Sequence, residues 1–422
     1  MADELFVTRY KRSAQDFTRT RVLTFQTITV LLMAKGMKSL QLSLNELIPK
    51  FGHSQQTVSK VAYSKARRKL KHGAFIELNQ EAVVKTMYED GDYQTYHGLR
   101  ILGTDGSKVL LPTNDETIKT FGANTHWNRS LSASGEHCFG LASVLYDVLN
   151  RVAIDAQLEP CSTYEVDVAA KHLKHTKDTD LTIYDRGYCS FRMMALASNA
   201  PGQFLIRCPS NRFQVARDMF AGKGPDDVTL EITAPRSFLV NPKNQGLSQT
   251  LTVRFVRVTL DDGSYEVLVT SLLDTARYPI EIFKELYWLR WGVETFYGIL
   301  KTRLGLENFS GYSPEAIRQD FYATILLTGI ESIFTADAEA ELSKQHGGHP
   351  KQVNKAVSFN AIKYRAFELF YSKAPRAEVL KKLDELFVTS PTLIRKDRKP
   401  PRRNVSSHHI LQFWKRQRKA VF

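Results

Sequence analysis

Three acidic residues stand in contexts that suit carboxylate chemistry. Asp105 ends an apolar run in the sequence Gly-Thr-Asp-Gly-Ser, and Asp185 ends a second run in Ile-Tyr-Asp-Arg-Gly-Tyr. Both runs predict strands, and the carboxyl ends of strands are where open α/β sheets gather catalytic and ligand-binding groups. Glu294 lies in the middle of a predicted helix. Any one of these acids alone is more often a cap, a turn residue or a surface charge, so the prediction of a site rests on all three.

The predicted helix that carries Glu294 has one polar stripe. At about 100° per residue, Arg290, Glu294 and Lys301 all lie within about 60° of Tyr287. The opposite side, at roughly 180° to 260° on the same scale, carries the apolar residues Leu289, Val293, Phe296, Leu300 and Leu304. An ordinary solvated face does not require Tyr, Arg, Glu and Lys at these offsets. The stripe therefore indicates a functional surface.

Residues 96–335 are predicted to hold the acidic site. Strands are expected at 99–104, 138–146, 151–158, 181–184 and 203–207, and helices at 163–175 and 190–199. This order is that of a ribonuclease-H-like core. Residues from about 208 to 275 interrupt it with β-rich sequence, and the helix of Glu294 is expected from Pro279 to about residue 304. The predicted fold class is α/β, a ribonuclease-H-like catalytic core with a β-strand insertion.

Both flanks of this core are predicted to be α-helical domains. In residues 1–95, a helix, a break at Gly52 and a basic helix together fit a helix-turn-helix on DNA. Arg67 and Arg68 of the basic helix are the predicted DNA contacts, and a small bundle with a solvated basic face is the alternative. Residues 336–422 are predicted to form a helical C-terminal domain that ends in a basic stretch. This stretch is either a solvated tail or a segment that binds phosphates.

Charge and cysteine content bound the possible partners and location. Lys and Arg number 58 against 44 Asp and Glu, a net charge of +14 that favours polyanionic partners, above all nucleic acid. The 4 cysteines are scattered without a C-x-x-C pair, which is typical of a reducing cytoplasm. Neither a signal-peptide pattern nor an apolar run of membrane-spanning length is present. We expect a cytoplasmic protein, nucleoid-associated when bound to DNA, with no membrane partner.

At this point the chain resembles a known family. The polar stripe is similar, in residue types and spacing, to the Y-R-E-K signature of a large group of bacterial insertion-sequence DDE transposases: Tyr287, Arg290, Glu294 and Lys301. Asp105 in T-D-G-S and Asp185 in Y-D-R-G-Y resemble the contexts of the family's two catalytic aspartates. The family also carries a β-strand insertion between the second aspartate and the glutamate. The resemblance covers residues from about 96 to 335 and extends more loosely to both helical flanks.

The resemblance implies a metal-dependent active site. Asp105, Asp185 and Glu294 are then catalytic and bind two Mg²⁺ or Mn²⁺ ions, because oxygen ligands suit these ions better than zinc. Two such ions activate an attacking water or 3′-hydroxyl and stabilise the departing oxygen.

The resemblance also implies where the DNA is held. Tyr287, Arg290 and Lys301 would bind phosphates at the transposon end. Trp291, about 40° from Tyr287 on the helix, is a further candidate DNA contact, with a core position as the alternative.

The implied reaction is cut-and-paste DNA transposition. The partners are the inverted repeats at the ends of the insertion sequence and the target DNA, and pairing two ends implies at least a homodimer in the DNA complex. One feature departs from the family. Some members stabilise a flipped base with a tryptophan on the β insertion, but no tryptophan lies between residues 128 and 287. Tyr265 or another aromatic residue serves instead, or no hairpin is formed.

Three other functions compete with this interpretation. A catalytically inactive DNA-binding regulator derived from a transposase has no need of three carboxylates facing phosphates. A stand-alone metal-dependent nuclease shares the acids but needs neither the Tyr, Arg and Lys stripe nor strand transfer. A glycosidase with a carboxylate pair does not fit the basic charge or the helix that carries Arg and Lys.

Overall fold

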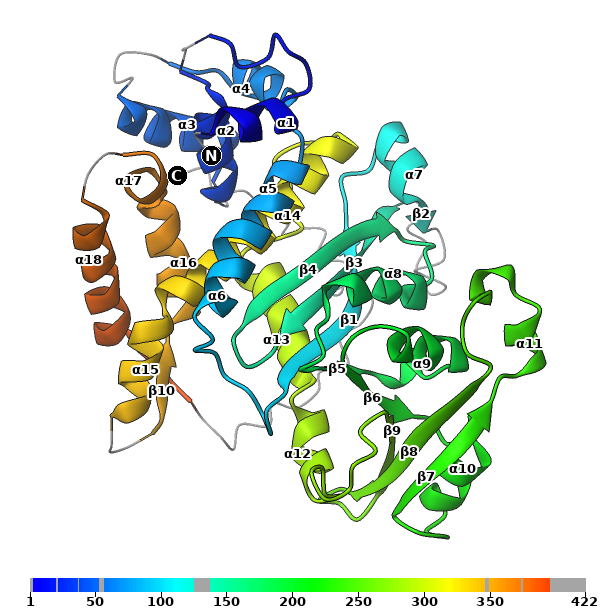
Figure 1. The fold of residues 1–422 in the computed structure, drawn as a ribbon. Coiled ribbons are helices and arrows are strands. Elements are labelled where there is room, and N and C mark those ends of the chain that lie inside the picture. Colours follow the sequence, from blue (N-terminus) through cyan, green and yellow to red (C-terminus); the bar gives the residue numbers. More distant parts are fainter. Residues whose placement is uncertain are drawn as a thin grey trace, which may run out of the picture. The chain divides into compact units, whose positions relative to one another are not determined.

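The computed structural model describes residues 3–19, 22–36, 38–52, 57–124, 137–345, 349–372 and 375–394. The chain forms two compact units (Figure 1). Unit 1 comprises residues 1–90, 108–140 and 298–422, and unit 2 comprises residues 91–107 and 141–297. This division brings segments from both flanks of the core into unit 1, so the boundaries near residues 95 and 335 stay predictions. The basic stretch at 395–403 lies outside the described residues.

Unit 2 is built on a large mixed sheet. Its strands follow the order β3-β1-β5-β6-β9-β8-β7, and β4 pairs with β3. The strands are β1 (Arg100–Leu110), β3 (His137–Asp147), β4 (Val152–Pro160), β5 (Asp180–Tyr184), β6 (Gln203–Cys208), β7 (Asp227–Thr233), β8 (Thr250–Thr259) and β9 (Tyr265–Thr270). β5 runs parallel to both β1 and β6, whereas β9 runs antiparallel to β6. The β-rich insertion therefore extends the sheet of the core.

Helices cover both faces of this sheet. Those of unit 2 are α8 (Glu165–His172), η3 (Leu173–His175), η4 (Arg186–Tyr188), α9 (Phe191–Ser198), α10 (Gln214–Phe220), α11 (Arg236–Leu239), η5 (Pro242–Asn244), α12 (Ile282–Trp288) and α13 (Trp291–Gly298). Side chains alternate along β6, so Phe204 and Ile206 pack in a core with α8, α9 and α10. Leu205 points the other way and packs in a second core with α12.

A buried chain of hydrogen bonds fixes α8 on the sheet. His172 of α8 lies with Nε2 3.0 Å from Ser143 Oγ and with Nδ1 2.8 Å from Asp155 Oδ2. Ser143 belongs to β3 and Asp155 to β4, and all three residues are at most 5% exposed. The order Ser-His-Asp resembles a hydrolase triad, but a hydroxyl this deeply buried meets no substrate. Its effect is to set the position of α8 and of its first residue, Glu165.

Unit 1 is mainly helical, with α14 at its centre. Its elements are α1 (Glu4–Tyr10), α2 (Phe25–Met33), α3 (Leu40–Leu47), η1 (Ile48–Phe51), α4 (Lys60–Arg67), α5 (Gly73–Asn79), η2 (Gln80–Val84), α6 (Lys85–Glu89), α7 (Asp115–Phe121), β2 (Ala123–Asn124), η6 (Ile299–Arg303), α14 (Pro314–Phe334), α15 (Ala336–Lys344), β10 (Lys351–Val353), α16 (Lys355–Tyr364), α17 (Ala366–Phe370), α18 (Arg376–Thr389) and β11 (Pro391–Leu393). α14 is 21 residues long and contacts α2, α5 and α16. Among the described residues, no helix has both the length and the apolar character needed to cross a membrane.

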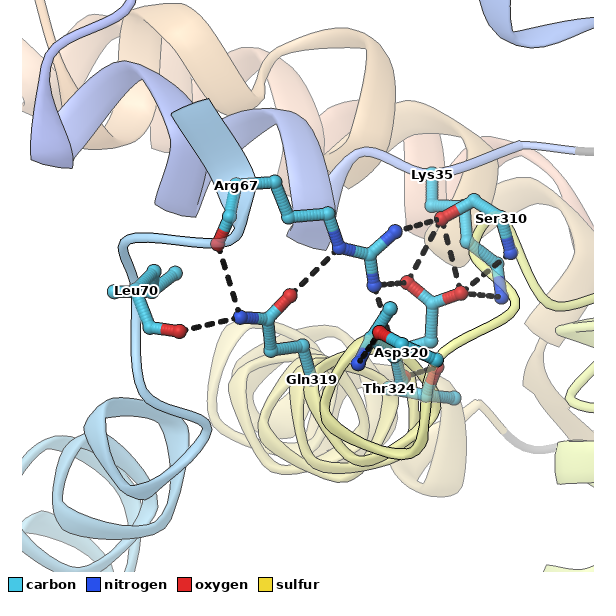
Figure 2. Close-up of polar contacts among 9 residues, drawn as sticks. Lys35, Arg67, Leu70, Ser310, Gln319, Asp320 and Thr324 are labelled. Carbon is cyan, nitrogen blue, oxygen red and sulfur yellow. Dashed lines mark hydrogen bonds and ion pairs between the residues drawn. The ribbon is translucent and has the colours of Figure 1, made fainter. Parts of the chain in front are cut away.

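Arg67 corrects one prediction. Figure 2 shows its guanidinium lying against α14, where Nε donates to Gln319 Oε1 at 2.6 Å and one terminal nitrogen pairs with Asp320 Oδ1 at 2.7 Å. The other terminal nitrogen donates to Ser310 Oγ at 2.7 Å. The Arg67 side chain is 4% exposed. The expected DNA contact at Arg67 is therefore wrong, because its donors are already used inside unit 1. Arg68, the next residue, is exposed.

Two predicted elements differ from the structure around the acidic residues. β1 does not end at Asp105 but continues to Leu110. The expected single helix from Pro279 to about residue 304 is divided, because α12 ends at Trp288 and α13 begins at Trp291. At the junction, two backbone hydrogen bonds span three residues instead of the four of an α-helix. The Arg290 amide donates to the Tyr287 carbonyl and the Val293 amide to the Arg290 carbonyl, each at 3.1 Å.

Candidate active site

Asp105 and Asp185 follow the last residue pair of two neighbouring parallel strands in unit 2. Strands β1 and β5 are parallel, and their last paired residues are Thr104 and Tyr184. Asp105 directly follows the first of these residues, and Asp185 directly follows the second. Asp185 continues in extended conformation, with φ −74° and ψ 168°. Side chains alternate in step along in-register strands, so the two aspartates project from the same face of the sheet.

Close backbone packing brings α13 to this face. A Cβ at Gly103 of β1 would lie 3.3 Å from the Val293 Cβ, and a Cβ at Gly292 would lie 2.9 Å from the Val148 Cβ. A side chain at Gly292 would force its neighbour to shift, and one at Gly103 would be tightly packed, so the two glycines favour this close approach. The hydroxyl of Tyr297 adds a polar tie, lying 3.0 Å from the carbonyl oxygen of Asp105. Glu294, between Val293 and Tyr297 on α13, is thereby placed near the end of β5 and the middle of β1.

Asp105 is partly buried among charged groups of both signs. The pKa of Asp105 is raised to about 6, mainly by burial; the charges of Glu294 and Glu165 also raise it, whereas the Gly106 amide and Arg290 lower it. The Gly106 amide donates to Asp105 Oδ1 at 2.8 Å. Asp105 therefore shares one electrostatic environment with Glu294, and a second cation nearby would favour its ionised form.

Arg290 is the cation that faces these carboxylates. Its terminal nitrogen pairs with Glu294 Oε1 at 2.7 Å, and its side chain is 5% exposed against 38% for Glu294. The guanidinium carbon lies 5.6 Å from the centre of the Tyr287 ring and 4.9 Å from that of Trp291. Burial lowers the pKa of Arg290, but Tyr287, Glu294 and Asp185 outweigh burial and raise it. Its Nε has no hydrogen-bond partner among the described residues.

Tyr287 orients the second aspartate. Its hydroxyl donates to Asp185 Oδ1 at 3.2 Å, and the residue is 4% exposed. Burial raises the pKa of the Tyr287 hydroxyl, with the charges of Asp185 and Glu266 adding to the effect. The hydroxyl therefore stays protonated and remains a hydrogen-bond donor. Tyr287 and Arg290 thus hold Asp185 and Glu294 respectively, which their predicted role as phosphate contacts did not include.

The remaining predicted DNA contacts lie in different settings. Trp291 is 42% exposed, so the core alternative for this residue is wrong. Lys301 belongs to unit 1, where its Nζ donates to the Lys108 carbonyl oxygen at 2.8 Å. It lies in η6, a π-helical segment, so the angle expected from a regular α-helix does not apply to it.

Two residues of this region had no role in the sequence prediction. Tyr188 falls within the Y-D-R-G-Y motif, and its buried hydroxyl has no hydrogen-bond partner among the described residues. Glu165 begins α8, and no sequence motif marks it. Only the packing of α8 against the sheet brings its charge near Asp105.

The donor set suits a divalent cation, although the carboxylates are not gathered around one point. In the part of the chain that the structure describes, no three His, Cys, Asp or Glu side chains are grouped closely enough to hold a metal ion. The charge balance nevertheless favours one, because Asp105, Asp185 and Glu294 all interact with a single guanidinium. Carboxylate oxygens are the ligands that Mg²⁺ and Mn²⁺ prefer.

Comparisons with known proteins identify a family for the chain. A search of curated proteins found no match to the chain. Among solved structures, the chain is similar to a piggyBac transposase in a synaptic complex with hairpin DNA, solved by cryo-electron microscopy. The identity is 9% and the TM-score 0.42, over 90% of this chain and 80% of that one. A family model described as the transposase DDE domain matches residues 97–329, which is more than half of the chain. The chain therefore belongs to the family of transposases with a DDE domain.

Proposed function

We propose that this protein is a DNA transposase of the Y-R-E-K group of bacterial insertion sequences. It binds the inverted repeats at the ends of its element and catalyses metal-dependent strand cleavage and strand transfer. The observation that carries the proposal is the placement of Asp105 and Asp185 directly after the paired residues Thr104 and Tyr184, with the charge of Glu294 acting on Asp105. The order of strands and helices in unit 2, from β1 to β6, supports a ribonuclease-H-like core.

The proposed catalytic residues are Asp105, Asp185 and Glu294. They would hold two Mg²⁺ or Mn²⁺ ions, which supply activation of a water or 3′-hydroxyl and stabilisation of the departing oxygen. Tyr287 fixes the orientation of Asp185 through its hydroxyl, at 3.2 Å. Tyr297 ties α13 to the backbone of Asp105. The two tyrosines therefore act as positioning residues for the carboxylates.

Binding of DNA is proposed for residues in both units. In unit 2, the unpartnered Nε of Arg290 is a donor that a phosphate oxygen can use, and the exposed ring of Trp291 can contact a base or sugar. In unit 1, the exposed Arg68 and the half-buried Lys301 supply cations. A homodimer that pairs two element ends is part of the proposal.

The test is cleavage of a labelled duplex that carries the element's ends. Wild-type protein is compared with Asp185→Asn and with Asp178→Asn, an exposed aspartate before β5, each with Mg²⁺, with Mn²⁺ and with EDTA. We expect metal-dependent nicking and joining to target DNA in wild type and in Asp178→Asn. Asp185→Asn should retain DNA binding and lose cleavage.

Other outcomes distinguish the alternatives. Binding without cleavage by the wild type, under Mg²⁺ and Mn²⁺ alike, would identify an inactive DNA-binding regulator. Cleavage without joining to target DNA would identify a stand-alone nuclease.

A further inference from the structure

Arg207 lies next to Asp185 in the sheet, on the neighbouring strand. β5 lies between β1 and β6, and the last paired residues of β5 and β6 are Tyr184 and Ile206. Arg207 follows Ile206 as Asp185 follows Tyr184, so the two residues stand at the same level of adjacent strands. Such strands lie about 4.8 Å apart. Asp105 stands at this level on the other side of Asp185.

The side chain of Arg207 projects from the face of the sheet that carries the candidate active site. Side chains alternate along a strand, so Arg207 points the same way as Leu205, two residues earlier. Leu205 packs in the core that also contains Ile183 and Tyr287. Asp185 likewise comes two residues after Ile183. Arg207 therefore shares its face of the sheet with Asp185 and with α12.

The contacts of Arg207 leave most of its guanidinium for a ligand. Its Nε pairs with Glu266 Oε1 of β9 at 2.8 Å, and the side chain of Arg207 is 37% exposed against 11% for Glu266. Its two terminal nitrogens make no hydrogen bond to a described residue. Two parallel N–H donors of a guanidinium can hold one phosphate. Glu266 therefore helps to position Arg207 without using the donors that a phosphate needs.

Arg207 and Arg290 act on the same neighbours. Burial raises the pKa of Glu266, and Asp185 adds to this effect, whereas the charges of Arg207 and Arg290 lower it without reversing the shift. Burial likewise raises the pKa of Tyr287, and both guanidiniums oppose that rise. A DNA strand that reaches Asp185 brings its phosphates among these carboxylates. Cations at this place offset the repulsion.

We infer that Arg207 binds a phosphate of the DNA strand held at Asp185, on the side of Asp185 that faces away from Asp105. This inference rests on the proposed function, since it adds a DNA contact to the same site. The competing role is structural, in which Arg207 only neutralises the largely buried Glu266. The two roles are separable, because a phosphate contact contributes to DNA binding whether or not Glu266 is charged.

The experiment measures binding of the full-length protein to a labelled duplex that carries the element's ends, in EDTA and over a range of salt concentrations. Arg207→Gln should weaken binding about 10- to 100-fold. It should also reduce the slope of log affinity against log salt by about 1. Arg207→Lys keeps a point charge and should recover part of the affinity. The matched control is Arg217→Gln, which removes an exposed arginine of α10, on the opposite face of the sheet, and should bind as wild type does.

The same substitution in a Glu266→Gln background separates the two roles. The double variant replaces the ion pair with two neutral amides, so it tests DNA binding even if Arg207→Gln alone is unstable. A phosphate contact predicts that Arg207→Gln weakens DNA binding in both backgrounds. An effect that disappears when Glu266 is neutral would assign Arg207 to the structural role and overturn the inference.

Two further results also decide the matter. Wild-type affinity and salt dependence in Arg207→Gln would overturn the inference and leave the proposed function standing. A wild-type protein that binds no DNA would overturn the proposed function, and this inference with it.

Discussion

Tyr287 and Arg290 are one helical turn apart, and each contacts a different candidate catalytic carboxylate. Tyr287 donates to Asp185 at 3.2 Å, and Arg290 pairs with Glu294 at 2.7 Å. Both contacts are made by side chains that are largely buried. At the scale of single residues, Tyr287 and Arg290 of the polar stripe therefore arrange the acids of the candidate site, in addition to their proposed contacts with DNA.

Replacing Tyr287 with phenylalanine tests this arrangement. The variant keeps the ring in its core and loses only the hydroxyl, so unfolding free energy should change by about 1 kcal/mol. DNA cleavage should fall about 10- to 100-fold, because Asp185 loses the donor that orients it. Single-turnover cleavage rates and urea unfolding measure the two effects.

Tyr278→Phe is the control, since Tyr278 is buried in the same core. Equal cleavage by Tyr287→Phe and Tyr278→Phe would show that the hydroxyl of Tyr287 does not support catalysis.

At the scale of elements, the C-terminal end of α4 has two adjacent arginines, one buried and one exposed. Arg67 is buried against α14, and Arg68, at the end of the helix, is exposed. Burial raises the pKa of Asp320, but the charges of Arg67 and Lys35 and the bonds from Ser310 outweigh burial and lower it. A charge buried in this way depends on its partners, so α4 is held to α14 mainly through Arg67.

Arg67→Met should therefore mainly reduce folding stability, whereas Arg68→Met should mainly weaken DNA binding. Arg67→Met leaves Asp320 with only Lys35 as a cation and should lower the free energy of unfolding by about 3–5 kcal/mol. Arg68→Met should change it by less than about 0.5 kcal/mol. It should weaken DNA binding at every sequence and reduce the slope of log affinity against log salt by about 1.

Urea unfolding and salt-dependent DNA binding measure the two variants side by side. If Arg68→Met bound DNA as wild type does at all salt concentrations, α4 would have no role in DNA binding through this residue.

At the scale of the whole molecule, each unit contains a buried aspartate with a lowered pKa. In unit 1 it is Asp320. In unit 2 it is Asp155. Burial raises the pKa of Asp155, but His172, Gln157 and His175 together lower this pKa by more, so the net shift is downward. An acid whose pKa is lower in the folded than in the unfolded state stabilises the fold above its unfolded pKa. That contribution is lost as the pH falls through the folded pKa.

The melting temperature of both units should therefore fall as the pH drops below about 4, the unfolded pKa of aspartate. Asp155→Asn should lower the stability of unit 2 at neutral pH and make it less sensitive to acid, while unit 1 keeps its acid sensitivity. Scanning calorimetry from about pH 3 to pH 7 measures this, with the exposed Asp178→Asn as control. An unchanged acid profile in Asp155→Asn would assign the acid sensitivity of unit 2 to other carboxylates.

The sequence alone determined most of what is local in this protein. Short apolar runs predicted β5 and β6 to within a residue, because buried strands are marked by consecutive apolar residues. Sequence context also singled out the acids Asp105, Asp185 and Glu294, although β1 continues past Asp105 to Leu110. Their roles as metal ligands stay predictions.

Tertiary structure decided what depends on packing between distant segments. The adjacent residues Arg67 and Arg68 look alike in sequence. Arg67 is buried because it pairs with residues of α14, some 250 residues further along the chain, whereas Arg68 is exposed. The division of the long helix at Arg290 and the nearness of Glu165 to Asp105 are equally hidden. Both features depend on which surfaces pack against the sheet. This packing is made by contacts between residues that are far apart in the chain, so local sequence does not predict it.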